Sequence, residues 1–147
     1  MDRCERAFAY RKEGFNCAQA VAGAFADLTG LGPETLMNAV KGFGGGVGGS
    51  SEEVCGAVSG GVFVLSLLNS DPADPAGRKT VYPKAREFRR RFQEVFGRTR
   101  CGELRAARPG VSEKTQAAAR LGASAHCDIM VITAAELLEE MLSEKNS

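Results

Sequence analysis

One apolar stretch constrains the fold of this chain more than any other feature. Residues 54–68 read VCGAVSGGVFVLSLL, and apolar side chains would fall on nearly every side of a helix formed by this stretch. Glycines and serines interrupt the run, and a membrane span needs roughly 18 or more apolar residues. We therefore expect no membrane insertion and, instead, a buried central helix near residues 51–69.

The rest of the chain also shows helical periodicity, and no segment has the strict alternation of a half-buried strand. Its 147 residues, 44% hydrophobic and 25% charged, suffice for one compact core. The sequence therefore predicts an all-α fold, with a single compact helical domain over residues 1–147. Further helices are expected after Asp2, at 16–28, from Pro33 onward, at 80–96, 101–104, 112–121 and 124–143.

Several residues are expected to begin these helices. Asn16 is a favourable N-cap, as is Ser124 for the last helix. Ser50 with Glu53 three residues later matches a capping box for the central helix. The helix at 80–96 should turn one apolar side inward and its arginines outward; the inward set is Tyr82, Ala85, Phe88, Phe92, Val95 and Phe96.

A glycine-rich segment precedes the central helix. Residues 42–49 read GFGGGVGG, and ordering so many glycines costs conformational entropy. No Gly-Lys-Ser/Thr follows and no strand precedes it, which excludes a Walker-type phosphate loop. We expect a loop whose backbone passes close to the cysteine-bearing segments or to a cofactor. Gly56 and Gly60, four residues apart, would likewise let another helix or a ligand approach closely.

Four dispersed cysteines fall where helices are expected to begin: Cys17, Cys55, Cys101 and Cys127. A thiol in the first turn of a helix faces unpaired N–H groups and the positive end of the helix dipole, which favour the thiolate. No pair has C-x-x-C spacing, so spacing alone leaves them equally open to being buried core residues. Thiol redox chemistry and thiolate–metal binding are the two chemistries that this residue type supports.

His126 and Cys4 are two further residues of types that could take part in such chemistry. His126, the only histidine, directly precedes Cys127 and could ligate a metal or act as a base toward a nearby thiol. Because adjacent helical residues point about 100° apart, we expect instead a histidine at the surface or in the N-cap region, outside a shared site. Cys4 stands apart from the four and is expected to be incidental. The N-terminal MDRCERAFAYRK has no apolar signal-peptide core, which favours a cytoplasmic protein whose cysteines are kept reduced.

Charge is unevenly distributed along the chain. Residues 78–108 hold eleven Lys or Arg against three Glu, although the net charge of the whole chain is only +1. Such a run is typical of the solvated face of one helix, and it is also compatible with an interaction module that binds an anionic partner. No aromatic platform accompanies it, so nucleic acid is not the expected partner.

The order of the cysteines, with Cys55-Gly-Ala-Val-Ser-Gly60 at its centre, resembles the redox-active C_GCAxxG_C_C family. The segments Phe15-Asn-Cys-Ala-Gln-Ala-Val21, Phe43-Gly-Gly-Gly46, Glu87-Phe88 and Cys101-Gly-Glu-Leu104 fit the same resemblance, which covers roughly residues 10–130. It implies a small helical protein, an oxidoreductase by hypothesis, whose site residues are Cys17, Cys55, Cys101 and Cys127. It also implies an electron-transfer or transporter-associated partner.

Several questions are left open by the sequence. The four cysteines are expected either to cycle between dithiol and disulfide or to hold zinc or an iron–sulfur cluster, with Gly56 and Gly60 beside the cofactor. Covalent haem is not expected, because the chain has no C-x-x-C-H. Which cysteines meet is undetermined. A homodimer is a further expectation, although no heptad seam supports it.

Overall fold

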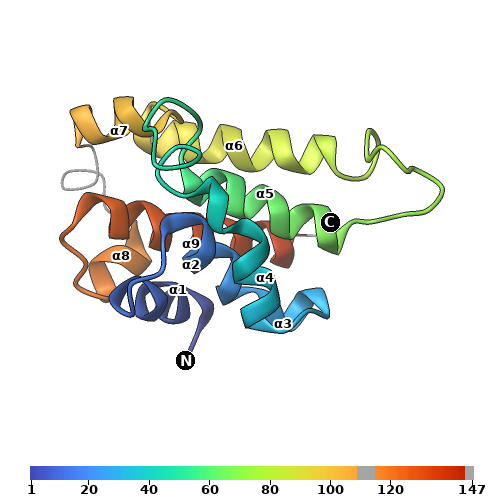
Figure 1. Ribbon diagram of the computed structural model, residues 1–147, viewed down its shortest axis with the longest axis horizontal. Helices are drawn as coiled ribbons and strands as arrows, with labels where there is room; N and C mark the ends of the chain where they lie inside the picture. The colour runs from blue at the N-terminus through green and yellow to red at the C-terminus, as the bar shows by residue number, and fades with distance from the viewer. Residues whose placement is uncertain (109–114, 145–147) are drawn as a thin grey trace.

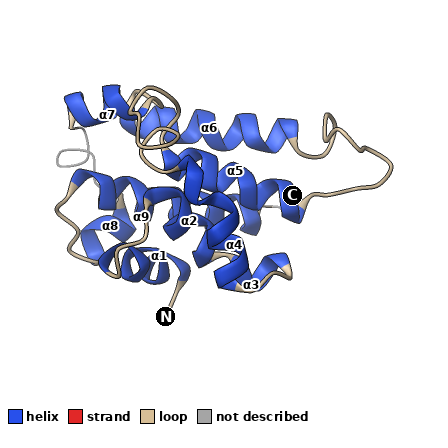
Figure 2. Ribbon diagram, in the orientation of Figure 1, coloured by secondary structure: helices blue, strands red, loops and turns tan. Residues whose placement is uncertain are grey.

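The computed structural model describes residues 1–108 and 115–144, and these form nine α-helices, one 3₁₀ turn and no strand (Figures 1 and 2). This confirms the all-α prediction. The helices are α1 (Arg3–Lys12), α2 (Cys17–Ala24), α3 (Ala26–Thr29), α4 (Pro33–Val40), α5 (Gly56–Leu68), α6 (Tyr82–Phe96), α7 (Cys101–Ala107), α8 (Gln116–Arg120) and α9 (His126–Ser143), with η1 at Lys41–Phe43.

Helices α2, α5 and α9 form the interior. Helix α2 packs against α1, α4, α5 and α9, and α6 lies along the far side of α5 (Figure 1). Helix α2 buries six of its eight residues, and α9 buries a continuous run from Ile129 to Ala135. None of the described helices is long and apolar enough to cross a membrane.

The central helix is present, but it begins later than predicted. Helix α5 starts at Gly56, with Cys55 as its N-cap, so the expected capping box at Ser50 and Glu53 is wrong. The Ser50 hydroxyl instead donates to the Gly46 carbonyl and accepts from the N–H of Glu52. Ser51 has a φ of 64°, which helical geometry does not allow, and Val54 is held extended by a bridge to Arg100.

Glycines set the distance between α5 and α2. A Cβ atom on Gly60 would lie 2.6 Å from the carbonyl oxygen of Ala18, and one on Gly56 would lie 2.3 Å from the Cys17 sulfur. On the other side of α5, a Cβ on Gly61 would lie 2.4 Å from the Phe88 ring of α6. The small residues of the central helix therefore let α2 and α6 approach its backbone directly.

The helix predicted at 16–28 is two helices. Asn16 caps α2 as predicted, and it forms a full capping box with Gln19. At Phe25 the backbone leaves helical geometry (φ −110°, ψ 11°) and α3 begins at Ala26. Phe25 is fully buried, whereas Leu28 is 43% exposed. The chain therefore buries the Phe25 ring at this point instead of continuing as one helix.

The later helices follow the predicted order with shifted starts. Helix α6 buries Phe88, Phe92 and Phe96, but Tyr82, at its first turn, is exposed and not inward as predicted. Helix α9 has Ala125 as its N-cap and no side-chain cap, so the expected capping by Ser124 is wrong. Of the helix predicted at 112–121, residues 112–114 lie outside the described residues, and α8 covers 116–120.

Candidate functional site

All four dispersed cysteines line one cavity of about 300 Å³. Cys17 is the first residue of α2, Cys55 the N-cap of α5, Cys101 the first residue of α7 and Cys127 the second residue of α9. The expectation that each lies at a helix start is therefore confirmed, and the four helix starts converge. Arg11, Arg105 and His126 line the same cavity.

The glycine-rich segment forms one wall of this cavity. Gly45, Gly46, Val47, Gly48 and Gly49 all have φ between 61° and 73°, a left-handed coil that glycine adopts at low cost. A Cβ on Gly46 would lie only 2.7 Å from the Cβ of Cys101, so a side chain there would displace that cysteine. The prediction of a loop that passes close to the cysteines is confirmed.

A short antiparallel bridge joins the starts of α5 and α7. Val54 pairs with Arg100, the N–H of Cys55 donates to the Thr99 carbonyl at 2.7 Å, and the N–H of Cys101 donates to the Glu53 carbonyl at 2.9 Å. In such a pair, the residues on either side of the bridged ones project to the same face. Cys55 and Cys101 therefore emerge on one side of the bridge, toward the cavity.

Cys17 is the cysteine most disposed to ionise. Its pKa is lowered to about 6, mainly because the neighbouring Cys55 thiol serves as a hydrogen-bond donor to its sulfur. The backbone N–H groups of Gly45 and Ala18 and the positive charge of Arg11 act in the same direction, and together they outweigh burial, which opposes ionisation.

The partner thiol shifts the other way. Cys55 is buried, and the pKa of its thiol is raised well above the ordinary value, first by its hydrogen bond to Cys17 and then by burial. The two sulfurs thus share one proton, with the negative charge on Cys17 and the hydrogen on Cys55. Burial also raises the pKa of Cys127, although it lies in the first turn of α9.

His126 is the first residue of α9, so the expected position in the N-cap region is confirmed, but it lines the cavity, and the expectation that it lies outside a shared site is wrong. Its Nε2 is 3.4 Å from the Cys127 sulfur, because the imidazole at the helix end is long enough to reach round to its neighbour. The pKa of His126 is lowered by burial and then by the positive charges of Arg108 and Arg105. The ring is therefore mostly neutral near pH 7.

Three lining residues were not found by sequence reasoning. Arg11 comes from the last turn of α1, where its Nε donates to Asp128 at 2.9 Å and its Nη1 to the Phe15 carbonyl at 3.1 Å. Arg105 comes from α7, and Met130 from α9. Only Arg105 lay in a segment that had been singled out for its charge, and nothing in the local sequence marks the other two.

Gly56 and Gly60, predicted to lie beside a cofactor, face α2 in the structure. The space next to them is filled by the Cys17 sulfur and the Ala18 backbone. The close approach of another helix, one of the two roles expected, is confirmed. Cofactor contact by these glycines stays a prediction.

The metal hypothesis required the four thiols to gather round one point. Among residues 1–108 and 115–144, no three His, Cys, Asp or Glu side chains are arranged to hold a metal ion. All five cysteines are free thiols, and Cys4 lies outside the cavity, in the first turn of α1. The side chains as they lie therefore do not fit a single ion such as zinc, while binding of an iron–sulfur cluster by the four thiols that line the cavity stays a prediction.

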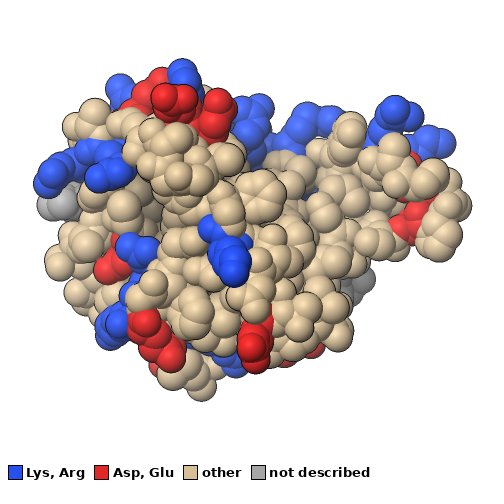
Figure 3. All heavy atoms as spheres, viewed as in Figure 1, with Lys and Arg blue, Asp and Glu red and all other residues tan. Residues whose placement is uncertain are grey.

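The basic stretch 78–108 is divided between two helices. On α6, Arg90 and Arg91 form ion pairs with Glu87, Glu94 and Glu144, which neutralise much of this face. Lys and Arg side chains also gather over the α7 end of the molecule (Figure 3), where Arg100, Arg105 and Arg108 are exposed. Binding of an anionic macromolecule by the whole stretch stays a prediction.

One comparison with known proteins gives a match. Residues 15–141 match a family model described as "Putative redox-active protein (C_GCAxxG_C_C)". No curated protein and no solved structure matches the chain.

Proposed function

This chain belongs to the C_GCAxxG_C_C family, and on that premise we propose that it is a thiol–disulfide oxidoreductase in which Cys17 attacks and Cys55 resolves. The observation that carries the proposal is that Cys17 and Cys55 line one cavity where α2 meets α5, and that the Cys55 thiol lowers the pKa of Cys17 to about 6. A thiolate with a pKa slightly below ambient pH is ionised and still nucleophilic, the combination that favours exchange.

In the first step, the Cys17 thiolate attacks one sulfur of a substrate disulfide. A bond forms between Cys17 and that sulfur, the substrate S–S bond breaks, and the leaving thiolate takes a proton from solvent. The product is a mixed disulfide in which Cys17 no longer carries a charge.

Loss of that charge prepares the second step. The two largest influences of Cys17 on its partner, the hydrogen bond and the electrostatic repulsion, both raise the pKa of Cys55, and both depend on the Cys17 thiolate. Once Cys17 is bonded to substrate, Cys55 loses its proton more readily and attacks the Cys17 sulfur. The bond between Cys17 and the substrate breaks, the leaving substrate thiolate takes up the proton that Cys55 lost, and the chain now holds a Cys17–Cys55 disulfide.

A reducing partner must then return two electrons and two protons to this disulfide. An electron-transfer partner was expected from the family resemblance, and we propose a dithiol protein in that role, acting in the cytoplasm. Cys101 and Cys127 remain thiols throughout this cycle. The proposed cycle uses the chain's own thiols and passes through no metal or cluster.

Disulfide mapping after mild oxidation tests this proposal. One equivalent of oxidised dithiothreitol or diamide should convert Cys17 and Cys55, and no other pair, to a disulfide that dithiothreitol reverses. Cys17→Ser and Cys55→Ser should each abolish the pair, while Cys4→Ala, which alters a buried cysteine outside the cavity, should leave it intact. Reversible bridging of another pair, or of none, would contradict the assignment.

A further inference from the structure

Apart from the Cys17 thiolate, the charged side chains that line the cysteine cavity are positive. Arg11 and Arg105 contribute this charge, and among the residues that the structure describes no Asp or Glu lines the cavity. Arg11 is held by Asp128 in an ion pair of 2.9 Å, so much of its charge is compensated. The negative charge of the Cys17 thiolate offsets part of what remains.

Arg105 differs from Arg11 in having no carboxylate partner among the residues that the structure describes. Its Nη1 donates to the Ser51 hydroxyl at 3.1 Å, a neutral acceptor that leaves the guanidinium charge uncompensated. Arg108, one turn further along α7, acts with Arg105 on His126, since both lower the pKa of that ring. The field of these two arginines therefore reaches the cavity wall.

The size of the cavity limits what can enter it. At about 300 Å³ it is at the small end of ligand pockets, large enough for a low-molecular-weight disulfide or one arm of it. A carboxylate carried two or three bonds from the reacting sulfur would then lie among the arginines. Clefts lined by one sign of charge concentrate ligands of the opposite sign.

We propose that the cysteine cavity takes small disulfides bearing carboxylates in preference to neutral or cationic ones, and that Arg105 determines this preference. The preference for a disulfide substrate rests on the proposed exchange reaction. The preference for negative charge rests on the cavity alone and is open to a separate measurement.

Alkylation of Cys17 measures the local charge without any disulfide chemistry. Iodoacetate and iodoacetamide are similar in size and differ in charge, and each forms an S–C bond as iodide leaves. The ratio of their rates at Cys17, read by peptide mass spectrometry, should exceed the ratio for the uncharged thiol N-acetylcysteine amide by roughly two- to fivefold at low salt. The excess should fall in 0.5 M NaCl, where charges are screened.

Two charge-matched variants assign the effect. Arg105→Gln should bring the iodoacetate-to-iodoacetamide ratio back to that of the free thiol. Arg89→Gln removes the same charge from the exposed face of α6, outside the residues that line the cavity, and should leave the ratio unchanged. A ratio equal to that of the free thiol in the wild-type chain, or equal losses in both variants, would overturn the assignment of Arg105.

Exchange kinetics then test the substrate class. The rates with dithiodipropionate, hydroxyethyl disulfide and cystamine, each divided by its rate with the uncharged thiol N-acetylcysteine amide, should decrease in that order, and Arg105→Gln should compress the series. Equal normalised rates would overturn the preference and leave the exchange reaction standing. A raised alkylation ratio with no reaction toward any disulfide would instead overturn the exchange reaction and retain the anion-selective cavity.

Discussion

Cys4 and Cys17 make a natural comparison, since both lie in the first turn of a helix. The pKa of Cys17 is lowered to about 6, whereas that of Cys4 is raised to about 12. Burial is the largest influence on Cys4, and the charges of Asp2, Glu136 and Glu139 add to it. A position at a helix start therefore does not by itself create a thiolate.

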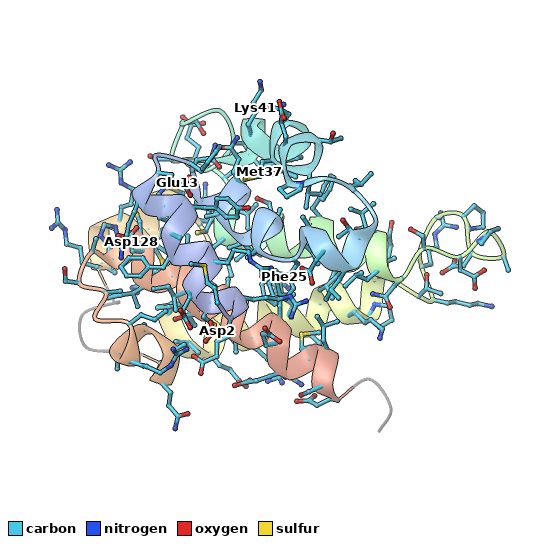
Figure 4. All side chains as sticks on the ribbon, turned by 90° about the horizontal axis from the view of Figure 1, so that it is seen from below. Asp2, Glu13, Phe25, Met37, Lys41 and Asp128 are labelled. Atoms are coloured by element: carbon cyan, nitrogen blue, oxygen red, sulfur yellow. The ribbon has the colours of Figure 1, made fainter. Side chains whose placement is uncertain are left out.

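The two thiols also lie in regions of opposite charge. Cys4 lines a small pocket with Asp2, Glu136, Glu139 and Arg120, at the start of α1. Arg11, near the other end of the same helix, lines the cysteine cavity. Figure 4 shows Asp2 at one end of α1, with Glu13 and Asp128 near the other. The surroundings of Cys17 differ from those of Cys4 in three ways. The Cys55 thiol and backbone N–H groups donate to the Cys17 sulfur, and the nearby charge is positive.

The largest expected effect is in the reactivity of the two thiols. At pH 7, iodoacetamide should modify Cys17 at least about a thousandfold faster than Cys4, because only the thiolate reacts and Cys4 is both protonated and buried. The rate at Cys17 should fall as pH is lowered through about 6. Peptide mass spectrometry over a time course measures both rates, and similar rates would remove the distinction between the two regions.

Removing the donor thiol should make Cys17 resemble an ordinary cysteine. In Cys55→Ala, the largest cause of the lowered pKa is lost, so the midpoint of the alkylation profile should move from about 6 toward roughly 8.5, and the rate at pH 7 should fall roughly thirtyfold. Cys55→Ser retains a hydroxyl donor and should lie between the two. If Cys55→Ala keeps the wild-type midpoint, the backbone N–H groups and Arg11 are the cause instead.

The close contact of α2 with α5 should also be measurable. Gly60→Ala places a methyl group 2.6 Å from the Ala18 carbonyl oxygen, and we expect a loss of about 1–2 kcal/mol in unfolding free energy together with slower Cys17 alkylation. Gly42→Ala has no atom within 4 Å of the new methyl group and serves as the control. Urea denaturation compares them, and equal stability of both variants would show that α2 is free to move away.

The smallest effect should come from the acidic pocket. Arg120→Gln removes ion pairs to Asp2 at 3.1 Å and Glu5 at 3.8 Å, both on exposed side chains, and should change the unfolding free energy by less than about 1 kcal/mol. The same urea experiment applies. A loss of several kcal/mol would mean that the region around Cys4 is as firmly organised as the cysteine cavity.

Which segments form helices was predictable from this sequence, because the spacing of apolar residues is a property of each local segment. Helix starts were less so. The α5 start depends on the left-handed φ of Ser51 and on a bridge between Val54 and Arg100, residues 46 apart in the chain. Neither is visible in the Ser50–Glu53 pattern. The break at Phe25 likewise follows from burial of one ring, which competes with helix continuity only in the folded chain.

For the candidate site, the sequence predicted that the four cysteines lie at helix starts and that the glycine loop passes close to them, but not how the cysteines meet. The donor relation of Cys55 to Cys17 was not predicted, since it depends on how closely α2 and α5 approach, which is set by glycines whose neighbours are on another helix. The position of His126 beside Cys127 in the cavity was also not predicted, because its imidazole is long enough to reach the neighbouring sulfur although adjacent helical residues point about 100° apart.

The groups that favour the Cys17 thiolate, apart from Ala18, come from elsewhere in the chain: Arg11 from α1, Gly45 from the loop and Cys55 from α5. While the protein is being synthesised, Cys17 therefore leaves the ribosome as an ordinary, largely protonated thiol. It becomes a strong nucleophile only after some forty further residues have emerged and folded against it. The lowered pKa of Cys17 is therefore a property of the folded chain and not of the segment around Cys17.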